Sequence, residues 1–371
     1  GISYCGQTPG SPSNPIIKCT ELWDGSSWTA TTGMITARMN HGGSGLQNSA
    51  IAFGGQPGPV FGATAEEWNG TAWSTGGALS TGRYSSRNFT AHAHNAIMAG
   101  GRNPGVVSCT EEYTGYYASA SFGRVDASAI AGSGIGLKNS KPESFLSSSF
   151  QIERDISGSF LYGVDGLTGT IGTATGVWSA GGTLNTARMY GAGAGSQNAA
   201  RLSGGSLNPA VPNENVKTEE YNGSSWTESG NLINARHAAA GDGTQNSAWI
   251  AGGATPSATA CTELYNGAGW VASAALSTAA SYMAGFGTVN SAVVFGGFTP
   301  TVQRRVEEFN GTSWSNAGDT LNTRGKTSGT GDSENTGLAI SGYNSTNLTC
   351  TEHYDGLNWS EGGALITHRK A

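Results

Sequence analysis

Short apolar runs that end in a pair of glycines recur along the chain at nearly regular intervals. The second glycine of these runs lies at Gly55, Gly101, Gly205, Gly253 and Gly297, with altered copies at Gly6 and Gly342. The run 248–253 is apolar on both faces, which is typical of a strand buried in the middle of a sheet. Glycines at its end allow the positive φ of a sharp turn. Each run therefore predicts one buried strand followed by a turn.

Three further strands accompany every apolar run. A strand is expected after the motif Leu-x-Thr-Ala-Arg, another in the pattern Thr-Glu-x-aromatic, and a last one at a tryptophan that follows an Asn-Gly pair. The Asn-Gly pair predicts a hairpin turn of type I′. The tryptophans are Trp28, Trp73, Trp178, Trp226, Trp270, Trp314 and Trp359.

The repeat is about 44 residues long and occurs seven times. A four-stranded sheet cannot bury both of its faces alone, and repeats of this length stack radially as the blades of a propeller. The sequence of an apolar strand with a glycine pair, then an aromatic residue, then tryptophan resembles the kelch family. Only four residues separate Tyr221 from Trp226, where kelch units usually have more, so we expect a shorter outer hairpin. The predicted fold is all-β, a seven-bladed kelch-like β-propeller with four-stranded blades.

A constant spacing between glutamate and arginine locates an insertion. Most repeats carry an arginine seventeen residues after the glutamate of the Thr-Glu strand, as in Glu21 and Arg38, Glu66 and Arg83, Glu219 and Arg236, Glu307 and Arg324, and Glu352 and Arg369. Glu111 and Arg188 obtain the same spacing only when the sixty residues 117–176 are removed. We therefore assign 1–116 and 177–371 to the propeller and 117–176 to an insertion in the third blade. The alternative is an eighth blade built from residues 160–178.

The repeated glutamate and arginine side chains are predicted to have a structural role. Each arginine begins the inner strand of one blade and the glutamate lies in the preceding blade, so an ion pair across every blade junction is expected. A ring of ligand-binding residues on the rim is the alternative. Glu263 faces Ala280 at this spacing and is the exception.

The two ends of the chain are predicted to share one blade. Residues 2–7 match 51–56, and residues 362–365 match 76–79. About nine residues of an inner strand are missing between the two matches, which leads us to expect that this sequence is part of a longer polypeptide.

Composition and charge exclude several classes of protein. Glycine accounts for 59 of 371 residues and only 12% of residues are charged, which suits short strands joined by tight turns. The net charge of −6 without a basic run argues against nucleic-acid binding, and no apolar stretch of about eighteen residues predicts a membrane span. Four cysteines, Cys19, Cys109, Cys261 and Cys350, occupy the same position in their repeats and are expected to be free, buried thiols.

No pattern of catalytic residues is evident in the sequence. Spacings typical of a Ser-His-Asp triad, a zinc site or a phosphate-binding loop are absent, and the pair His92 and His94 has no third metal ligand nearby. Asp24-Gly-Ser-Ser-Trp28 is only loosely similar to the Asp box of sialidase-like propellers, and the scattered histidines do not match a copper oxidase. We expect a protein that is not an enzyme and has no cofactor; a propeller glycosidase or copper oxidase is the disfavoured alternative.

The nearly identical blades resemble the kelch-like structural proteins of marine tailed phages. Segments 121–125 and 151–160 within the insertion resemble those that interrupt propeller arrays in such virion proteins. The resemblance implies a tail fibre, capsid decoration or other appendage on the virion surface, which binds a host-surface glycan or protein. It also implies that 117–176 docks to other virion proteins or to copies of the same chain. A cytoplasmic kelch adaptor is the alternative. Loops 205–217 and 7–18 are the most irregular and share one rim, so that rim is predicted to make the contact.

Overall fold

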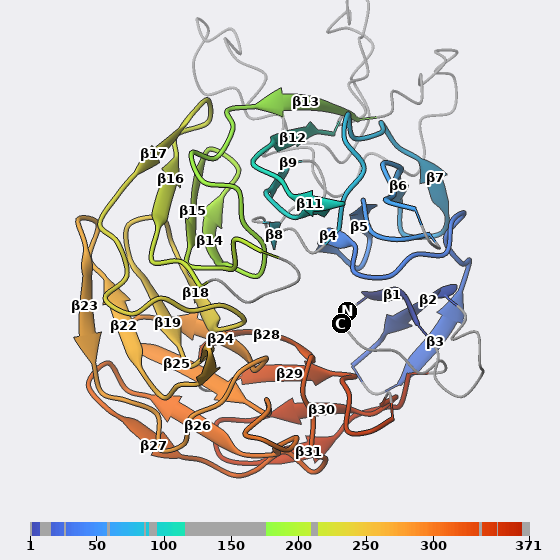
Figure 1. Ribbon diagram of the computed structural model, residues 1–371. Coiled ribbons are helices and arrows are strands. Elements are labelled where there is room, and N and C mark those ends of the chain that lie inside the picture. Colours follow the sequence, from blue (N-terminus) through green and yellow to red (C-terminus); the bar gives the residue numbers. More distant parts are fainter. Residues whose placement is uncertain are drawn as a thin grey trace, which may run out of the picture. The chain divides into compact units, whose positions relative to one another are not determined.

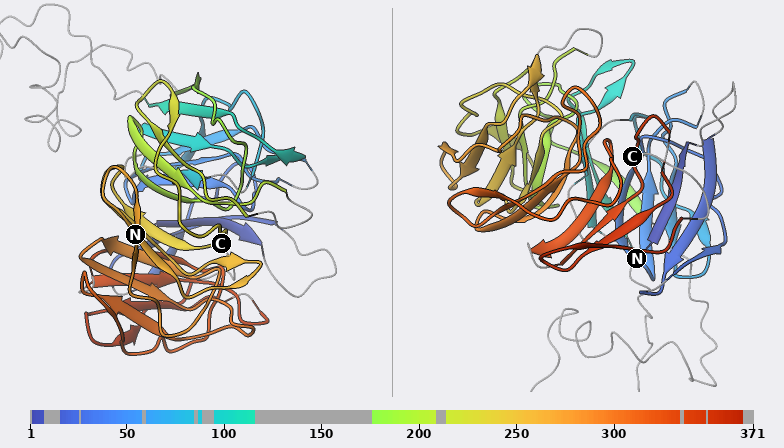
Figure 2. Two further views of the ribbon diagram at one scale, coloured as in Figure 1. Left: turned by 60° about the vertical axis from the view of Figure 1, so that its left-hand side comes forward. Right: turned by 90° about the horizontal axis from the view of Figure 1, so that it is seen from below.

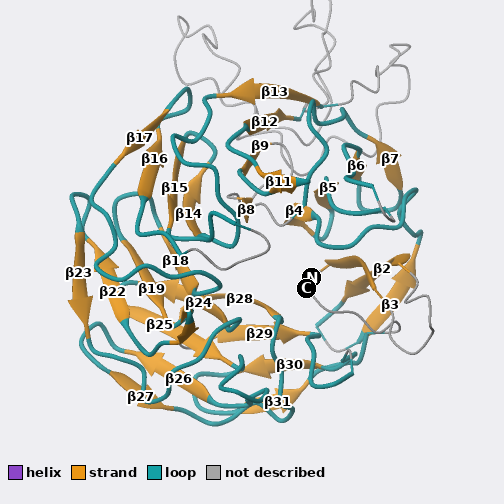
Figure 3. Cartoon of the chain, viewed as in Figure 1, coloured by secondary structure: helices purple, strands orange, loops and turns teal. Residues whose placement is uncertain are grey.

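The computed structural model describes residues 2–7, 16–25, 27–57, 60–84, 87–88, 95–115, 176–208, 214–333, 336–346 and 348–365. The chain divides into two compact units, of which the first comprises Gly1–Gly115 and Thr175–Ala371. The second unit, Tyr116–Ala174, lies outside the described residues. The described residues form strands, turns and loops (Figure 3), and they include no helix that could cross a membrane.

Seven antiparallel sheets lie in a ring in the first unit, and each sheet is one blade (Figure 1). Blade 1 contains β1 (Ile2–Gln7), β2 (Ile16–Trp23) and β3 (Trp28–Thr31). Blade 2 contains β4 (Gly42–Leu46), β5 (Ser49–Phe53), β6 (Ala65–Trp68) and β7 (Trp73–Thr75). Blade 3 contains β8 (Arg87–Asn88), β9 (Asn95–Ala99), β12 (Thr110–Thr114) and β13 (Val177–Gly181). Blade 4 contains β14 (Ala192–Ser196), β15 (Ala199–Ser203), β16 (Thr218–Tyr221) and β17 (Trp226–Glu228).

The remaining blades repeat this order from the centre outward. Blade 5 contains β18 (Ala240–Gly243), β19 (Ala248–Ala251), β22 (Thr262–Tyr265) and β23 (Trp270–Ser273). Blade 6 contains β24 (Ala284–Thr288), β25 (Ser291–Phe295), β26 (Val306–Phe309) and β27 (Trp314–Asn316). Blade 7 contains β28 (Ser328–Ser333), β29 (Thr336–Ile340), β30 (Thr351–Tyr354) and β31 (Trp359–Glu361). The loops that join the second and third strands of blades 3 and 5 each contain a short two-stranded ribbon. In blade 3 it is formed by β10 (Arg102–Asn103) and β11 (Gly105–Val106), and in blade 5 by β20 (Ala254–Thr255) and β21 (Ser257–Ala258).

The seven-bladed prediction is confirmed, and the eight-bladed alternative is wrong. Trp178 lies in β13, where it faces Tyr113 of β12, just as Trp226 faces Tyr221 in blade 4. It therefore completes blade 3 instead of closing another blade. The chain leaves β12 after Thr114 and pairs again at Val177, its direct partner across the hairpin.

The second strand of each blade forms much of the core. Residues 50–53 of β5 and 292–295 of β25 are buried throughout, on both faces of the strand. Both faces are covered because the neighbouring blades pack against them, as in the cluster of Trp249, Val294 and Phe309 from blades 5 and 6. The predicted positive φ of the glycine pair is also observed, at 66° for Gly54 and 86° for Gly55.

The hairpin between the third and fourth strands differs from the predicted type I′ turn. Trp68 pairs with Trp73, so four residues form the loop, and Asn69 is not among the residues with positive φ. The side-chain oxygen of Asn69 instead accepts hydrogen bonds from the backbone N–H groups of Thr71 and Ala72, both at 2.9 Å. Because asparagine can close a turn with its own side chain, a longer loop forms at the same sequence.

Blades 1 and 7 lie side by side and close the ring (Figure 2). The indole Nε1 of Trp28 donates to the hydroxyl of Thr351 at 3.2 Å, across 323 residues of sequence. The rings of Trp23 and His353 are 5.0 Å apart. The structure describes three strands of blade 1, and the predicted contribution of the C-terminal end to this blade lies outside the described residues, which stop at Leu365.

Candidate functional site

The repeated arginines form buried ion pairs within their own blades. Arg38 Nη2 lies 2.6 Å from Glu66 Oε1, and the exposed fractions of the two side chains are 1% and 3%. The other pairs of this kind are Arg83 with Glu111, Arg188 with Glu219, Arg236 with Glu263, and Arg324 with Glu352. The predicted pairing across blade junctions is therefore wrong for Glu21 and Arg38, Glu66 and Arg83, Glu111 and Arg188, Glu219 and Arg236, and Glu307 and Arg324. Arg369, the predicted partner of Glu352, lies outside the described residues.

The path of the chain explains why each arginine stays in its own blade. The guanidinium of Arg236 lies under the ends of β19 and β22, where its Nη1 donates to the carbonyls of Gly252 at 3.2 Å and Cys261 at 2.7 Å. Its Nη2 lies 2.5 Å from Glu263 in β22. Burial lowers the pKa of Arg236, and Glu263 opposes that effect. Backbone carbonyls and the carboxylate together replace the water that this cation loses on folding.

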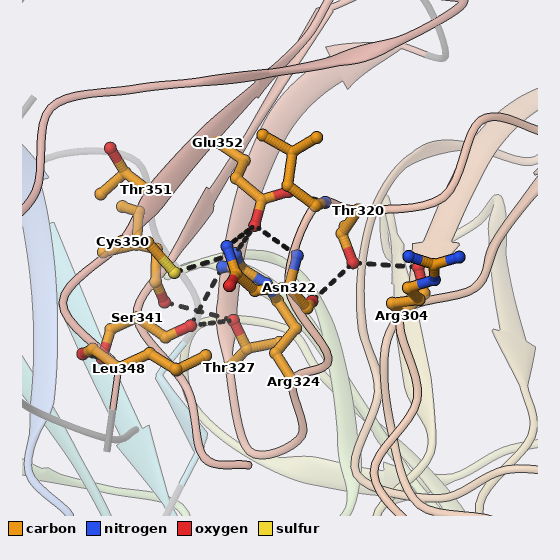
Figure 4. Close-up of polar contacts among 12 residues, drawn as sticks. Arg304, Thr320, Asn322, Arg324, Thr327, Ser341, Leu348, Cys350, Thr351 and Glu352 are labelled. Atoms are coloured by element: carbon orange, nitrogen blue, oxygen red, sulfur yellow. Dashed lines mark hydrogen bonds and ion pairs between the residues drawn. The ribbon is translucent and has the colours of Figure 1, made fainter. Parts of the chain in front are cut away.

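In blades 2 to 7 the glutamate also accepts a hydrogen bond from the backbone of the loop that enters its blade. Glu263 accepts hydrogen bonds from the backbone N–H groups of Ile233 at 2.7 Å and Asn234 at 3.2 Å, in the segment that comes from blade 4. Figure 4 shows the equivalent network in blade 7, where Arg324 and Asn322 converge on Glu352. The five arginines and their glutamate partners named above are therefore held by contacts within the scaffold.

In blade 6 an arginine at a different position of the repeat forms the ion pair with the glutamate. Ala280 stands where the other blades carry arginine, and Arg305, two residues before Glu307, forms the ion pair with that glutamate. Arg305 occupies the position that is a cysteine in blades 1, 3, 5 and 7. Its second nitrogen donates to the carbonyl of Thr278 at 2.6 Å, in the loop that enters blade 6. The carboxylate is thus neutralised although the usual arginine is absent.

Hydrogen bonds of three other kinds join neighbouring blades. The second glycine of the pair donates its N–H to the carbonyl of the next blade's arginine, as from Gly55 to Arg83 at 2.8 Å. The tryptophan indole donates to a threonine of the preceding blade in the pairs Trp28–Thr351, Trp73–Thr20, Trp226–Thr110, Trp270–Thr218 and Trp314–Thr262. The tyrosine hydroxyl donates to a glutamate of the preceding blade in the pairs Tyr221–Glu112, Tyr265–Glu220 and Tyr354–Glu308. These bonds supply the junction contacts that the sequence led us to expect from glutamate and arginine.

Two tryptophans lack the threonine partner, and the sequence explains both cases. Trp178 faces blade 2, which has Ala65 at the threonine position, and Trp359 faces blade 6, which has Val306 there. The indole Nε1 atoms of Trp178 and Trp359 are buried without a hydrogen-bond partner among the described residues. A buried donor that loses water without gaining a partner costs about 1–3 kcal/mol.

The substitution Val306→Thr is expected to raise the free energy of unfolding by about 1 kcal/mol, because its hydroxyl can accept the Trp359 indole proton. The matched reverse change, Thr262→Val, removes the acceptor of Trp314 and should lower stability by about 1–3 kcal/mol. Chemical denaturation of both variants measures the difference. A loss of stability in Val306→Thr would contradict the assignment of an unsatisfied indole.

The aromatic residue of each third strand is matched to its neighbour in the preceding blade. For Tyr221, Tyr265 and Tyr354 the neighbour is the glutamate named above, and for Tyr113 it is Glu67. Where the aromatic residue is Phe309 or Trp68, the neighbouring position holds Leu264 or Leu22. At the closing junction, Trp23 lies against His353. Burial raises the pKa of Tyr221, and its bond to Glu112 raises it further, so the hydroxyl stays protonated at neutral pH. Each blade therefore fits the blade that precedes it.

This matching predicts a coupling between Leu264 and Phe309. The variant Phe309→Tyr should be destabilised by about 1–3 kcal/mol, because its hydroxyl would be buried against an apolar leucine. Leu264→Glu in addition should recover at least about 1 kcal/mol of this loss, as expected for residues in contact. Denaturation of the four members of this double-mutant cycle gives the coupling, and additive effects would show that the two positions do not recognise each other.

The cysteines and histidines form no reactive centre in the part of the chain that the structure describes. Cys109, Cys261 and Cys350 are free thiols, as predicted, but they and Cys19 are half-buried, so the prediction of burial is wrong. Burial raises the pKa of the Cys350 thiol, which keeps it protonated. Within the described ranges no three His, Cys, Asp or Glu side chains could hold a metal ion, and the predicted pair His92 and His94 lies outside them.

Two sets of loops meet at one end of the blades, which we call the loop face. One set joins second to third strands, and the other carries the arginine motif from blade to blade. Single antiparallel bridges connect the two sets: Met39 with Gln56, Tyr84 with Arg102, Met189 with Ser206, His237 with Ala254, Ser281 with Phe298, and Gly325 with Tyr343. Because strand direction alternates within a blade, the Asn-Gly hairpins lie at the opposite end.

Two positions after the arginine, or after Ala280 in blade 6, five described blades have a left-handed backbone conformation on the loop face. The φ values are 52° at Asn40, 57° at Tyr190, 52° at Ala238, 55° at Tyr282 and 48° at Lys326. The N–H groups of the last three donate to the carbonyl of the equivalent residue in the preceding blade. The backbone is thus the same in five blades, while the side chain changes from blade to blade.

Aromatic and polar side chains gather around Tyr282. We define the Tyr282 cluster as Tyr190, His237, Tyr282, Phe298 and Lys326. The rings of His237 and Phe298 lie 6.4 Å and 6.1 Å from that of Tyr282, and Lys326 Nζ lies 5.4 Å from its centroid. Burial raises the pKa of Tyr282, and Tyr190 adds to that effect. Tyr190, Tyr282 and Phe298 are half-buried, and Lys326 is exposed.

The irregular loop 205–217 reaches this cluster. Glu214 Oε1 lies 3.5 Å from His237 Nδ1. Residues 209–213 of this loop, and 8–15 of the second predicted contact loop, lie outside the described residues. The sequence pointed to this rim but not to Tyr282, although the aromatic residues that follow the arginine motif by two positions were visible in it.

A comparison of the chain with models of known protein families gives no match, and a comparison with curated proteins gives none either.

Proposed function

We propose that the protein is a non-enzymatic binding protein of a virion surface, of the kelch-like type, which contacts a host-surface glycan or protein through its loop face. The observation that carries this proposal is the division of roles between interior and loop face. The arginine–glutamate pairs are buried within the blades, and five of the repeated tryptophans donate hydrogen bonds between blades. The side chains that differ between blades at one shared backbone position lie on the loop face.

Two further features support the proposal. The near-identical blades resemble structural proteins of marine tailed phages, in which a propeller displays loops. A rigid scaffold that carries variable loops is the usual arrangement of binding proteins. The proposed contact of 117–176 with virion proteins or with copies of the chain rests on the resemblance alone, because those residues other than Gly176 lie outside the described part.

Shielding one face at a time tests this function. Ser257→Cys places a thiol at an exposed position in the β20–β21 ribbon of the loop face, and Thr312→Cys places one in an exposed hairpin at the opposite end. Each variant is coupled to maleimide-polyethylene glycol, and wild type treated in the same way controls for the native thiols. Binding of labelled protein to a panel of marine bacteria is measured by flow cytometry.

Coupling at position 257 is expected to abolish cell binding, and coupling at position 312 to leave it unchanged. Equal binding by both coupled proteins would exclude the loop face. Absence of binding by wild type, together with recovery of a stable cytoplasmic partner, would favour the alternative of a cellular kelch adaptor.

A further inference from the structure

The Tyr282 cluster combines apolar ring faces with His237, whose Nδ1 atom is buried and forms no hydrogen bond with the described residues. Tyr190, Tyr282 and Phe298 are half-buried, so that part of each ring stays accessible. His237 Nδ1, Glu214 Oε1 and Asn215 Nδ2 are buried and form no hydrogen bond with the described residues, although His237 Nδ1 and Glu214 Oε1 lie 3.5 Å apart. His237 is 8% exposed and its ring lies 6.4 Å from that of Tyr282, so His237 Nδ1 and the neighbouring Glu214 Oε1 lie on one side of the aromatic rings.

Unpartnered polar atoms of this kind are costly and call for an explanation. A buried donor or acceptor without a partner costs about as much as a lost hydrogen bond. The three atoms come from the irregular loop of blade 4 and from the arginine motif of blade 5. They comprise a donor on Asn215, an acceptor on Glu214 and a ring nitrogen on His237 that can serve as either.

The backbone strain at the cluster points in the same direction. Tyr190 and Tyr282 have φ of 57° and 55°, a conformation that bulky side chains rarely adopt. Ala238 occupies the same position in blade 5 with φ of 52°, so the fold does not require an aromatic residue there. Strained residues of this type concentrate at sites that bind ligands.

We infer that the Tyr282 cluster is a saccharide-binding site, which deepens the proposed function and rests on it. A pyranose ring has an apolar C–H face, which can pack on Tyr282 and Phe298, and hydroxyl groups around its edge. Such a ligand needs apolar walls together with a few polar groups. The cluster supplies the walls through its half-buried rings and a donor through the exposed Lys326.

A glycan array of neutral and acidic pyranose oligosaccharides tests the inference. The full chain is applied as wild type and as Tyr282→Ala, which gives blade 6 the residue that blade 5 already carries at this position. Tyr84→Ala is the matched control, because Tyr84 lies on the same face but contacts Phe61 and Arg102 instead. Thermal unfolding of each variant is measured in parallel to show that the ring remains folded.

Wild type is expected to bind at least one pyranose oligosaccharide, and Tyr282→Ala to weaken that binding about tenfold or more, as truncation of a central aromatic contact does. Tyr84→Ala should retain it. No binding by folded wild type, or equal binding by folded Tyr282→Ala, would overturn the assignment. In that case a positive result from the shielding experiment at position 257 would leave the proposed function intact and point to another part of the loop face.

Discussion

The substitution Glu263→Ala is expected to lower the free energy of unfolding by about 3–5 kcal/mol. Arg236 would remain as a buried cation with an exposed fraction of 0% and only backbone carbonyls as partners. The N–H groups of Ile233 and Asn234 would lose their acceptor at the same time. Loss of one partner of a buried pair is costly because the remaining charge cannot return to water.

The control for this experiment is a glutamate in the neighbouring blade. Glu228 pairs with Lys217 at 2.8 Å, but 47% of the Glu228 side chain and 34% of the Lys217 side chain are exposed. Glu228→Ala should therefore cost no more than about 1 kcal/mol. Urea denaturation of both variants measures the difference, and equal effects would show that the buried pair does not differ from a surface one.

The second large effect is expected in blade 6, where Arg305→Cys should cost about 3–5 kcal/mol because Glu307 loses its cation. Blade 5 shows how the loss can be repaired, since it has Arg236, Ala239 and Cys261 at the positions of Ala280, Met283 and Arg305. Met283 Sδ lies 3.9 Å from Arg305 Nη2, so its side chain occupies part of the space near the pair.

The triple variant Ala280→Arg, Met283→Ala, Arg305→Cys transfers the arrangement of blade 5 into blade 6. We expect it to recover most of the stability lost by Arg305→Cys, because the new arginine would reach Glu307 from the usual side. Thermal and urea unfolding of the single and triple variants give the comparison. A triple variant that is less stable than Arg305→Cys would show that the two routes to the carboxylate are not equivalent.

Much of the fold could be predicted from the sequence because each blade repeats the same local signals. The number of blades followed from the tryptophans and glycine pairs, and the spacing from glutamate to arginine located the insertion, after which Trp178 pairs with Tyr113. These signals are local to one strand or turn. They therefore did not depend on knowing which blades touch.

The pairing of charges could not be read from spacing alone. A repeat that carries one glutamate and one arginine gives two recurring separations, seventeen residues forward from glutamate and 27 to 31 forward from arginine. The structure uses the longer one, as in Arg38 with Glu66. Blade 6 held the deciding signal, because Ala280 is compensated by Arg305, close to Glu307 and far in sequence from Glu263.

The Tyr282 cluster lay beyond the reach of the repeat pattern for a related reason. Its members come from blades 4, 5, 6 and 7, and they meet only because the ring brings equivalent positions together. A repeat pattern shows which positions are equivalent but not how their side chains contact one another. The left-handed backbone at Tyr190 and Tyr282 arises in the turn that leads into the inner strand, and no local sequence motif predicted this conformation.

The pairing of each arginine within its own blade, and the closure of the ring between blades 1 and 7, are tested most directly by a crystal structure of this chain. We predict density that joins the guanidinium of Arg236 to Glu263, with Trp28 Nε1 within hydrogen-bonding distance of Thr351. Density that joined Arg236 to Glu219 instead, or that placed Trp28 away from blade 7, would contradict this arrangement of the propeller.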